Sequence, residues 1–240
     1  MYLKELRYYF TTPVAYIVIG LYLLTISLFL WVIPGDWNIP QSGYSQADGL
    51  FVVAPWLLLF LCPALTMRLF AEERQLGTWS LLLTKPLSLG RIVAGKYFAA
   101  WTVVLFAQIP TIIHYFLVYY IAQPIGNIDS GAFFGAFVGL LLLSALFCAL
   151  GIFAATLSKS QIISFVIGIC LCFVLFYGFD LLVPFVEKTS LLGIVKWMSI
   201  NEHYMVLSSG VIDLRDVVYF ISSAILWVLI SILSLKNIKE

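Results

Sequence analysis

Residues 132–157 read AFFGAFVGLLLLSALFCALGIFAATL and contain no charged side chain. The hydrocarbon core of a bilayer is about 30 Å thick and an α-helix rises about 1.5 Å per residue, so about 20 consecutive apolar residues are enough to cross it. Hydrocarbon offers no partner to backbone N–H and C=O groups, whereas a helix satisfies these groups within one segment. Residues 132–157 are therefore predicted to form a transmembrane helix.

Five more stretches of this kind lie on either side of the first. The uncharged cores of all six are residues 13–33, 50–67, 97–122, 132–157, 161–179 and 217–235. With neighbouring residues included, the predicted transmembrane helices span 13–33, 50–70, 93–122, 131–157, 161–183 and 217–235. The composition agrees, because 62% of the residues are hydrophobic, only 10% are charged and the mean hydropathy is +1.05. We expect an all-α membrane protein with a single domain, residues 1–240.

Basic residues gather on one side of this predicted arrangement. If the N-terminus is cytoplasmic, ten of the thirteen Lys and Arg residues fall in cytoplasmic segments. These ten are Lys4, Arg7, Arg68, Arg74, Lys85, Arg91, Lys96, Lys159, Lys236 and Lys239. The other three, Lys188, Lys196 and Arg215, lie in one outer loop, so the positive-inside rule predicts that both termini face the cytoplasm. The formal net charge of +1 gives no reason to expect nucleic-acid binding.

The span cores lack the groups that ion-coupled transport requires. Ionisable side chains at membrane depth cost about 2.5 to 3.5 kcal/mol each and are kept for function, and these cores hold no Asp, Glu, Lys or Arg. The sequence therefore argues against a secondary transporter and indicates that energy comes from another chain. His114, one turn after Pro110 in the third span, is expected to be a hydrogen-bonded packing residue near a kink; a proton relay is the alternative.

The four cysteines, at positions 62, 148, 170 and 172, all lie in predicted spans. Cys170 and Cys172 point about 200° apart around a helix and cannot share a metal ion. We expect the cysteines to be small buried apolar residues, with redox or metal roles as the alternative. A membrane-embedded enzyme would need clustered nucleophiles or ligands, and the two histidines, His114 and His203, fall at different depths.

Residues 1–12, MYLKELRYYFTT, predict an amphipathic helix too short to cross the membrane. Leu3, Leu6 and Phe10 are expected on one face with Tyr2 and Tyr9, and the other face is expected to carry Lys4, Glu5 and Arg7. Such a helix lies in the membrane interface and serves at least as an anchor. Pro13 suits the first turn of the helix that follows.

The segment of residues 71–90, between the second and third spans, carries an ordered series of helix signals. Gly77 breaks the preceding helix, Thr78 can cap a new one and Pro86 ends it. The apolar stripe between them consists of Leu76, Trp79, Leu82 and Leu83. A short helix with one apolar face suits a groove in a partner protein. An ordinary solvated loop is the alternative, but it does not explain this order of Gly, Thr, Trp and Pro.

Two further patterns concern the outer side and helix packing. Residues 184–216 are predicted to form re-entrant or interfacial helices, because each apolar piece is too short or too charged to cross. Four polar residues of this segment could form a weak cation site; the alternative is that they are simply solvated. These residues are Glu202, His203, Asp213 and Asp216.

In the fourth span small residues recur every four positions at Gly131, Gly135 and Gly139. This spacing allows close helix approach, either within the subunit or at a dimer seam.

The inner segment carries the pattern Glu72-Glu73, Gly77-Thr78, Leu81-Leu82, Lys85-Pro86 and Gly95-Lys96. This pattern resembles the segment that follows the second membrane helix in permease subunits of ABC-2 type transporters. The outer segment Glu202-His203, Gly210-Val211-Ile212-Asp213 and Arg215-Asp216 is similar to the stretch before the sixth helix in the gliding-motility-associated branch of that family. Permeases that serve copper-site maturation or antibiotic export share most of these marks.

The resemblance implies a role for each segment. Residues 1–12 would be the family's elbow helix, and residues 71–90 its coupling helix, docked on a partner ATPase. The residues implied in ATPase coupling are Glu72, Glu73, Gly77, Thr78, Trp79, Leu82, Lys85 and Pro86. Those singled out in the outer loop are His203, Gly210, Asp213 and Asp216.

The same resemblance implies the surroundings of the chain. A dimer of ABC ATPase subunits would bind ATP and Mg²⁺, and the chain itself would hold no catalytic residue, metal or cofactor. A second permease subunit, identical or related, and an accessory subunit with a periplasmic domain would complete the assembly among the lipids of a bacterial inner membrane. We expect ATP-driven export or transmembrane movement, for gliding motility or secretion. The alternative is a mechanotransmitting subunit that moves no substrate.

Overall fold

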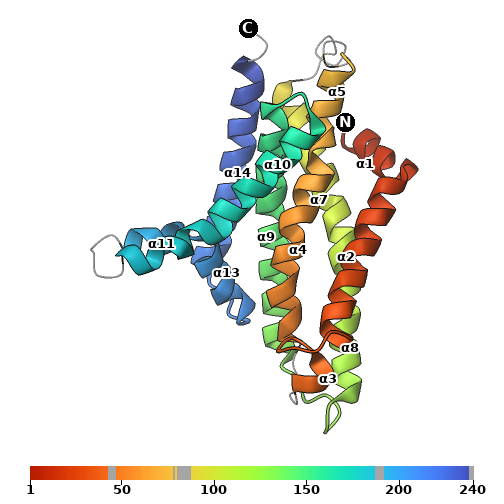
Figure 1. The fold of residues 1–240 in the computed structure, drawn as a ribbon, viewed down its shortest axis with the longest axis vertical. Helices are drawn as coiled ribbons and strands as arrows, with labels where there is room; N and C mark the ends of the chain where they lie inside the picture. The colour runs from red at the N-terminus through yellow and green to blue at the C-terminus, as the bar shows by residue number, and fades with distance from the viewer. Residues whose placement is uncertain (43–46, 78, 80–87, 187–191, 238–240) are drawn as a thin grey trace.

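The computed structural model describes residues 1–42, 47–77, 79, 88–186 and 192–237, and Figure 1 shows these residues as a bundle of helices. Within them, six helical segments are long and apolar enough to cross a membrane: Pro13–Trp31, Asp48–Gln75, Leu89–Ile121, Ser130–Leu157, Gln161–Phe185 and Leu214–Lys236. The described residues contain no strand. The prediction of an all-α protein with six membrane-spanning helices is confirmed, and the chain is a multi-pass membrane protein.

Several spans consist of more than one helix. The elements in the first half are α1 (Tyr2–Thr11), α2 (Pro13–Trp31), α3 (Ile39–Ser42), α4 (Asp48–Thr66), α5 (Arg68–Gln75), α7 (Leu89–Gln108), the 3₁₀ turn η1 (Ile109–Thr111) and α8 (Ile112–Ile121). Those in the second half are α9 (Ser130–Leu157), α10 (Gln161–Phe173), the π-helical turn η2 (Val174–Gly178), α11 (Phe179–Val186), α12 (Leu192–Met198), α13 (Ile200–Ser208) and α14 (Leu214–Asn237). The third span therefore changes its helix type at Pro110.

Helix α9 forms the centre of the bundle. It contacts α4, α7, α10, α13 and α14, and most of its residues are buried, whereas few residues of the spans that contain α2, α10 and α14 are buried. The reason lies in its composition, because glycine, alanine and serine recur along α9 and let neighbouring backbones come close. The exposed apolar faces of the outer helices suit a lipid or protein environment rather than water.

Helix α1 does not present the faces expected from its sequence. Glu5 is only 5% exposed and shares the buried face with Tyr9, whereas Leu3 is 73% exposed. Residues four apart lie on the same side of a helix, and α1 packs on α2 and α7, so contact with these helices decides which face is covered. The expectation that Glu5 lies on the face away from Tyr9, with Lys4 and Arg7, was therefore wrong; Lys4 and Arg7 themselves are exposed.

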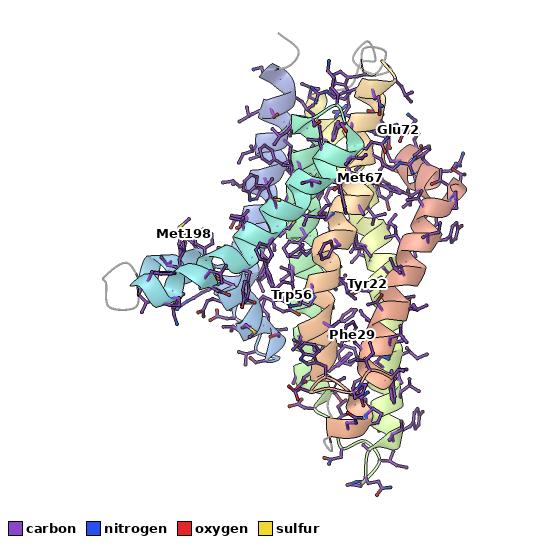
Figure 2. The ribbon with its side chains drawn as sticks, in the orientation of Figure 1. Tyr22, Phe29, Trp56, Met67, Glu72 and Met198 are labelled. Carbon is purple, nitrogen blue, oxygen red and sulfur yellow. The ribbon has the colours of Figure 1, made fainter. Side chains whose placement is uncertain are left out.

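The fifth span leaves the bundle after the π-helical turn. Figure 1 shows α10 crossing the front of the bundle at an angle and α11 continuing sideways away from it. Helices α12 and α13 then return the chain, and α13 packs against α9. Figure 2 shows Met198 on this lateral arm, well apart from Glu72 at the end of the bundle that carries α1.

Candidate functional site

A buried ion cluster joins three helices where the predicted coupling segment begins. Lys96 of α7 is 1% exposed, and its Nζ lies 2.9 Å from Glu73 Oε1 of α5 and 3.3 Å from Glu5 Oε1 of α1. The same Nζ donates to the Leu69 carbonyl oxygen at 2.7 Å. We call Glu5, Glu73 and Lys96 the Lys96 cluster.

The surroundings of Lys96 explain why a lysine can be buried there. An ammonium group has three N–H donors, and these three oxygens are three acceptors at hydrogen-bonding distance. The Phe70 ring adds an attractive face, with its centroid 5.2 Å from Nζ. A buried charge is tolerated when it is paired and hydrogen-bonded, and removal of either type of partner leaves an uncompensated charge.

A second, more exposed layer of polar side chains covers the Lys96 cluster. Tyr8 Oη donates to Glu72 Oε1 at 3.1 Å, and Arg68 Nε donates to Glu72 Oε2 at 3.3 Å. Arg68 Nη2 also donates to Tyr8 Oη at 3.3 Å. Partial burial, followed by the hydrogen bond to Glu72, raises the pKa of the Tyr8 hydroxyl above its ordinary value. Tyr8 therefore remains a neutral donor that holds α1 to α5 at physiological pH.

These two layers line a cavity of about 310 Å³ between α1 and α5. Its walls carry both signs of charge, and the charged lining residues are Lys4, Arg68, Lys96, Glu5, Glu72 and Glu73. Helix α1 is fixed from both sides of the cavity, because Tyr9 Oη donates to the Leu65 carbonyl oxygen at 2.6 Å and Tyr2 Oη lies 3.1 Å from Thr102 Oγ1. A displacement of α5 is thus resisted by α1 and α7 together.

The predicted coupling segment is described only in part. Gly77 has φ +71°, a left-handed conformation that favours glycine and ends α5. Trp79 packs on Phe70 with ring centroids 5.8 Å apart, which connects the segment to the base of the Lys96 cluster. Thr78, Leu82, Lys85 and Pro86 lie outside the described residues. Arg74 Nη1 donates to the Thr156 carbonyl oxygen at 2.6 Å, so α5 is also tied to the end of α9.

A family model described as ABC-2 family transporter protein matches residues 37–236. The chain belongs to this family. The match covers α3 to α14 and includes Glu73 and Lys96, whereas α1 and its Glu5 precede it. A search of curated proteins finds no match. Membership identifies the chain as a transporter membrane subunit, in a family that works with an ABC ATPase and is generally not catalytic itself.

In this ABC-2 family chain the outer-loop residues lie in separate contacts and do not form one cluster. His203 Nδ1 lies 2.6 Å from Asp216 Oδ1, and Asp213 Oδ1 accepts from the Arg215 backbone N–H at 2.9 Å. Gly210 packs against the backbone of α9 at Gly135. No group of three His, Cys, Asp or Glu side chains in the described part of the chain is arranged to hold a metal ion, so the geometry does not favour the weak cation site.

The glycines of α9 lie against the outer segment of the same ABC-2 subunit. A Cβ placed on Gly139 would be 2.7 Å from Leu207 Cβ, and one on Gly135 would meet the Gly210 carbonyl. Gly131 is less crowded, since the nearest atom to such a Cβ is Asp129 Oδ1 at 3.4 Å. Two of the three glycines therefore make room for neighbours within the chain.

His114 and three of the four cysteines lie in the core of the ABC-2 bundle, so the expectation of buried cysteines was wrong for Cys170. Trp31 Nε1 donates to His114 Nδ1 at 3.0 Å, which fits a hydrogen-bonded packing histidine. Cys62, Cys148 and Cys172 are fully buried, and Cys170 is exposed on α10. The sequence placed Lys96 at the edge of the third span, as it did Arg91 on the same helix, and no sequence signal predicted that Lys96 is buried in ion pairs while Arg91 is exposed.

Proposed function

We propose that this chain is the permease subunit of an ATP-driven ABC complex, and that residues 71–90 receive the motion of a partner ATPase. The observation that carries the proposal is the Lys96 cluster, because it links the start of this segment to the third span and to α1. Family membership supplies the reason for a partner ATPase, which would bind ATP and Mg²⁺.

The contacts suggest how such motion would pass into the membrane. If the ATPase displaces α5, Glu73 either takes Lys96 and α7 with it or breaks a buried ion pair. Breaking that pair is costly at low dielectric, so joint movement of the helices is the favoured response. Tyr8, held by Glu72, and Glu5, held by Lys96, would shift α1 in the same step.

The assembly we propose contains two permease subunits, identical or related, and two ATPase subunits in a bacterial inner membrane, with both termini of the chain cytoplasmic. An accessory subunit with a periplasmic domain and surrounding lipids would complete it. Export or transmembrane movement for gliding motility or secretion is supported by the resemblance of residues 202–216 to that branch. A subunit that transmits force without moving substrate would use the same inner contacts.

The proposal is tested by co-expressing the chain with its ATPase and purifying the complex from membranes. In Gly77→Ala the left-handed residue gains a Cβ, which costs about 1 to 2 kcal/mol at the end of α5. Glu72→Ala removes the contacts to Tyr8 and Arg68. We expect both variants to retain less ATPase and to show lower ATP hydrolysis at unchanged membrane levels.

The matched control is Gly20→Ala in α2, where an added Cβ meets no atom within 4 Å. It should bind and stimulate the ATPase as the unmodified chain does. Full ATPase binding and activity in both Glu72→Ala and Gly77→Ala would contradict the coupling role. ATP hydrolysis without flux in sealed vesicles, combined with movement of an accessory subunit, would identify force transmission instead of transport.

A further inference from the structure

His203 is held between two helices by both nitrogens of its ring. Nδ1 lies 2.6 Å from Asp216 Oδ1 on α14, and Nε2 lies 2.9 Å from the Trp197 carbonyl oxygen on α12. The ring also stacks on Tyr219 of α14, with centroids 3.9 Å apart. Tyr219 Oη donates to the Met198 carbonyl oxygen at 2.9 Å, next to the Trp197 contact. The imidazole thus fastens α12 and α13 to the start of α14.

The number of protons on the ring decides how many of these bonds can form at once. A carboxylate and a carbonyl oxygen both only accept, so each ring nitrogen must carry a hydrogen for both bonds to form. A neutral imidazole carries one such hydrogen and an imidazolium carries two. Both bonds together therefore require an imidazolium beside an ionised Asp216.

The other charged groups nearby are engaged elsewhere. Glu202 pairs with Lys196 at 3.5 Å, linking α13 to α12. Asp180 of α11 accepts from Ser199 Oγ at 2.7 Å and from Asn201 Nδ2 at 2.6 Å. Before α14, Asp213 accepts from the Arg215 backbone. Asp216, only 6% exposed, is the carboxylate that bonds the ring, and Tyr219 is a neutral phenol against its face.

We propose that protonated His203 is a pH-operated latch that fastens α12 and α13 to α14. As pH rises the imidazolium loses one proton, one of the two bonds is lost, and α12 and α13 loosen from α14. Histidine changes charge between about pH 5 and pH 8, so the latch works in a physiological range. The latch is connected to the central helix of the bundle, because α13 packs on α9 through Leu207 at Gly139. On the topology proposed above, the latch responds to the pH outside the cell.

The charge of the ring is measured directly by ¹⁵N NMR of the full chain labelled at histidine. The chain contains two histidines, His114 and His203, so the spectrum is simple and His203→Gln assigns it. We expect one ring with both nitrogens protonated at about pH 6, absent from His203→Gln. A His203 ring with a single protonated nitrogen at this pH overturns the proposal.

The latch itself is measured by hydrogen exchange of residues 197–216, corrected for the intrinsic pH dependence of exchange. Protection should fall about tenfold or more between about pH 5.5 and pH 8.5, as expected for a lost hydrogen bond to a charged group. His203→Gln and Asp216→Asn should show low, pH-independent protection. Tyr219→Phe is the matched control, because it removes the bond to Met198 but leaves the titrating pair, so pH dependence should persist. The same pH profile in His203→Gln as in the unmodified chain overturns the proposal.

Discussion

At the scale of single residues, Lys96 is a buried charge held by ion pairs at the start of the coupling region. It has one positive charge, two carboxylate partners and almost no contact with solvent. A buried ion pair gives little net stability compared with an apolar substitute, because both charges lose hydration. We infer that the role of the ammonium is to hold α1, α5 and α7 in one arrangement. Any other arrangement of these helices would separate Lys96 from its carboxylate partners.

Lys96→Met tests this constraint. The substitution keeps an unbranched side chain but removes the cation that pairs with the buried Glu5 carboxylate. Leaving a buried charge unpaired costs about 3 to 5 kcal/mol, so thermal unfolding of the purified chain in detergent should occur at a clearly lower temperature. Adding Glu5→Gln to Lys96→Met should restore part of the loss, because it removes the uncompensated charge of Glu5.

The control for this substitution is Lys4→Met. Lys4 lines the same cavity but is exposed, and surface substitutions usually change stability by less than about 0.5 kcal/mol. Equal melting temperatures for Lys96→Met and Lys4→Met would show that the buried ion pairs of Lys96 do not contribute to thermal stability.

At the scale of helices, the membrane spans could be predicted from the sequence, but the faces through which the helices contact one another could not. An uncharged apolar run of about 20 residues crosses a bilayer as an α-helix, so residues 132–157 and the five similar runs could be recognised as spans from the sequence. The face of α1 depends instead on α7, whose Lys96 lies 91 positions from Glu5 in the chain. No local spacing encodes that contact, and the amphipathic pattern consequently placed Glu5 on the face away from Tyr9.

The packing of α9 on the α13 region gives the prediction at this scale. Gly139→Ala would place a Cβ 2.7 Å from Leu207 Cβ, and Gly135→Ala would meet the Gly210 backbone, which a rotamer change cannot relieve. We expect each to lower the free energy of unfolding by about 1 to 3 kcal/mol. Gly131→Ala on the same helix is the control and should be neutral or slightly stabilising. Comparable losses at all three glycines would point to a general intolerance of α9 rather than to this contact.

At the scale of the whole molecule, the two ends of the bundle differ in what they carry. Figure 1 shows α1, α5 and the end of α14 at one end, and α3 with the connection between α8 and α9 at the other. The first end carries the Lys96 cluster and the cavity between α1 and α5. It also carries Arg68, Arg74 and Lys236, which the positive-inside rule assigns to the cytoplasm.

Single cysteines at the two ends test that orientation in intact cells with a membrane-impermeant maleimide. Gln75→Cys and Lys236→Cys should react only after the cells are opened, whereas Asp36→Cys and Asn127→Cys should react at once; all four positions are exposed. The native cysteines set the background, since Cys62, Cys148 and Cys172 are buried and Cys170 lies in a membrane-spanning helix. Immediate labelling of Gln75→Cys would place residues 71–90 outside the cell, beyond reach of any ATPase. Labelling only in opened cells leaves this segment on the side where ATP is available, as the coupling role requires.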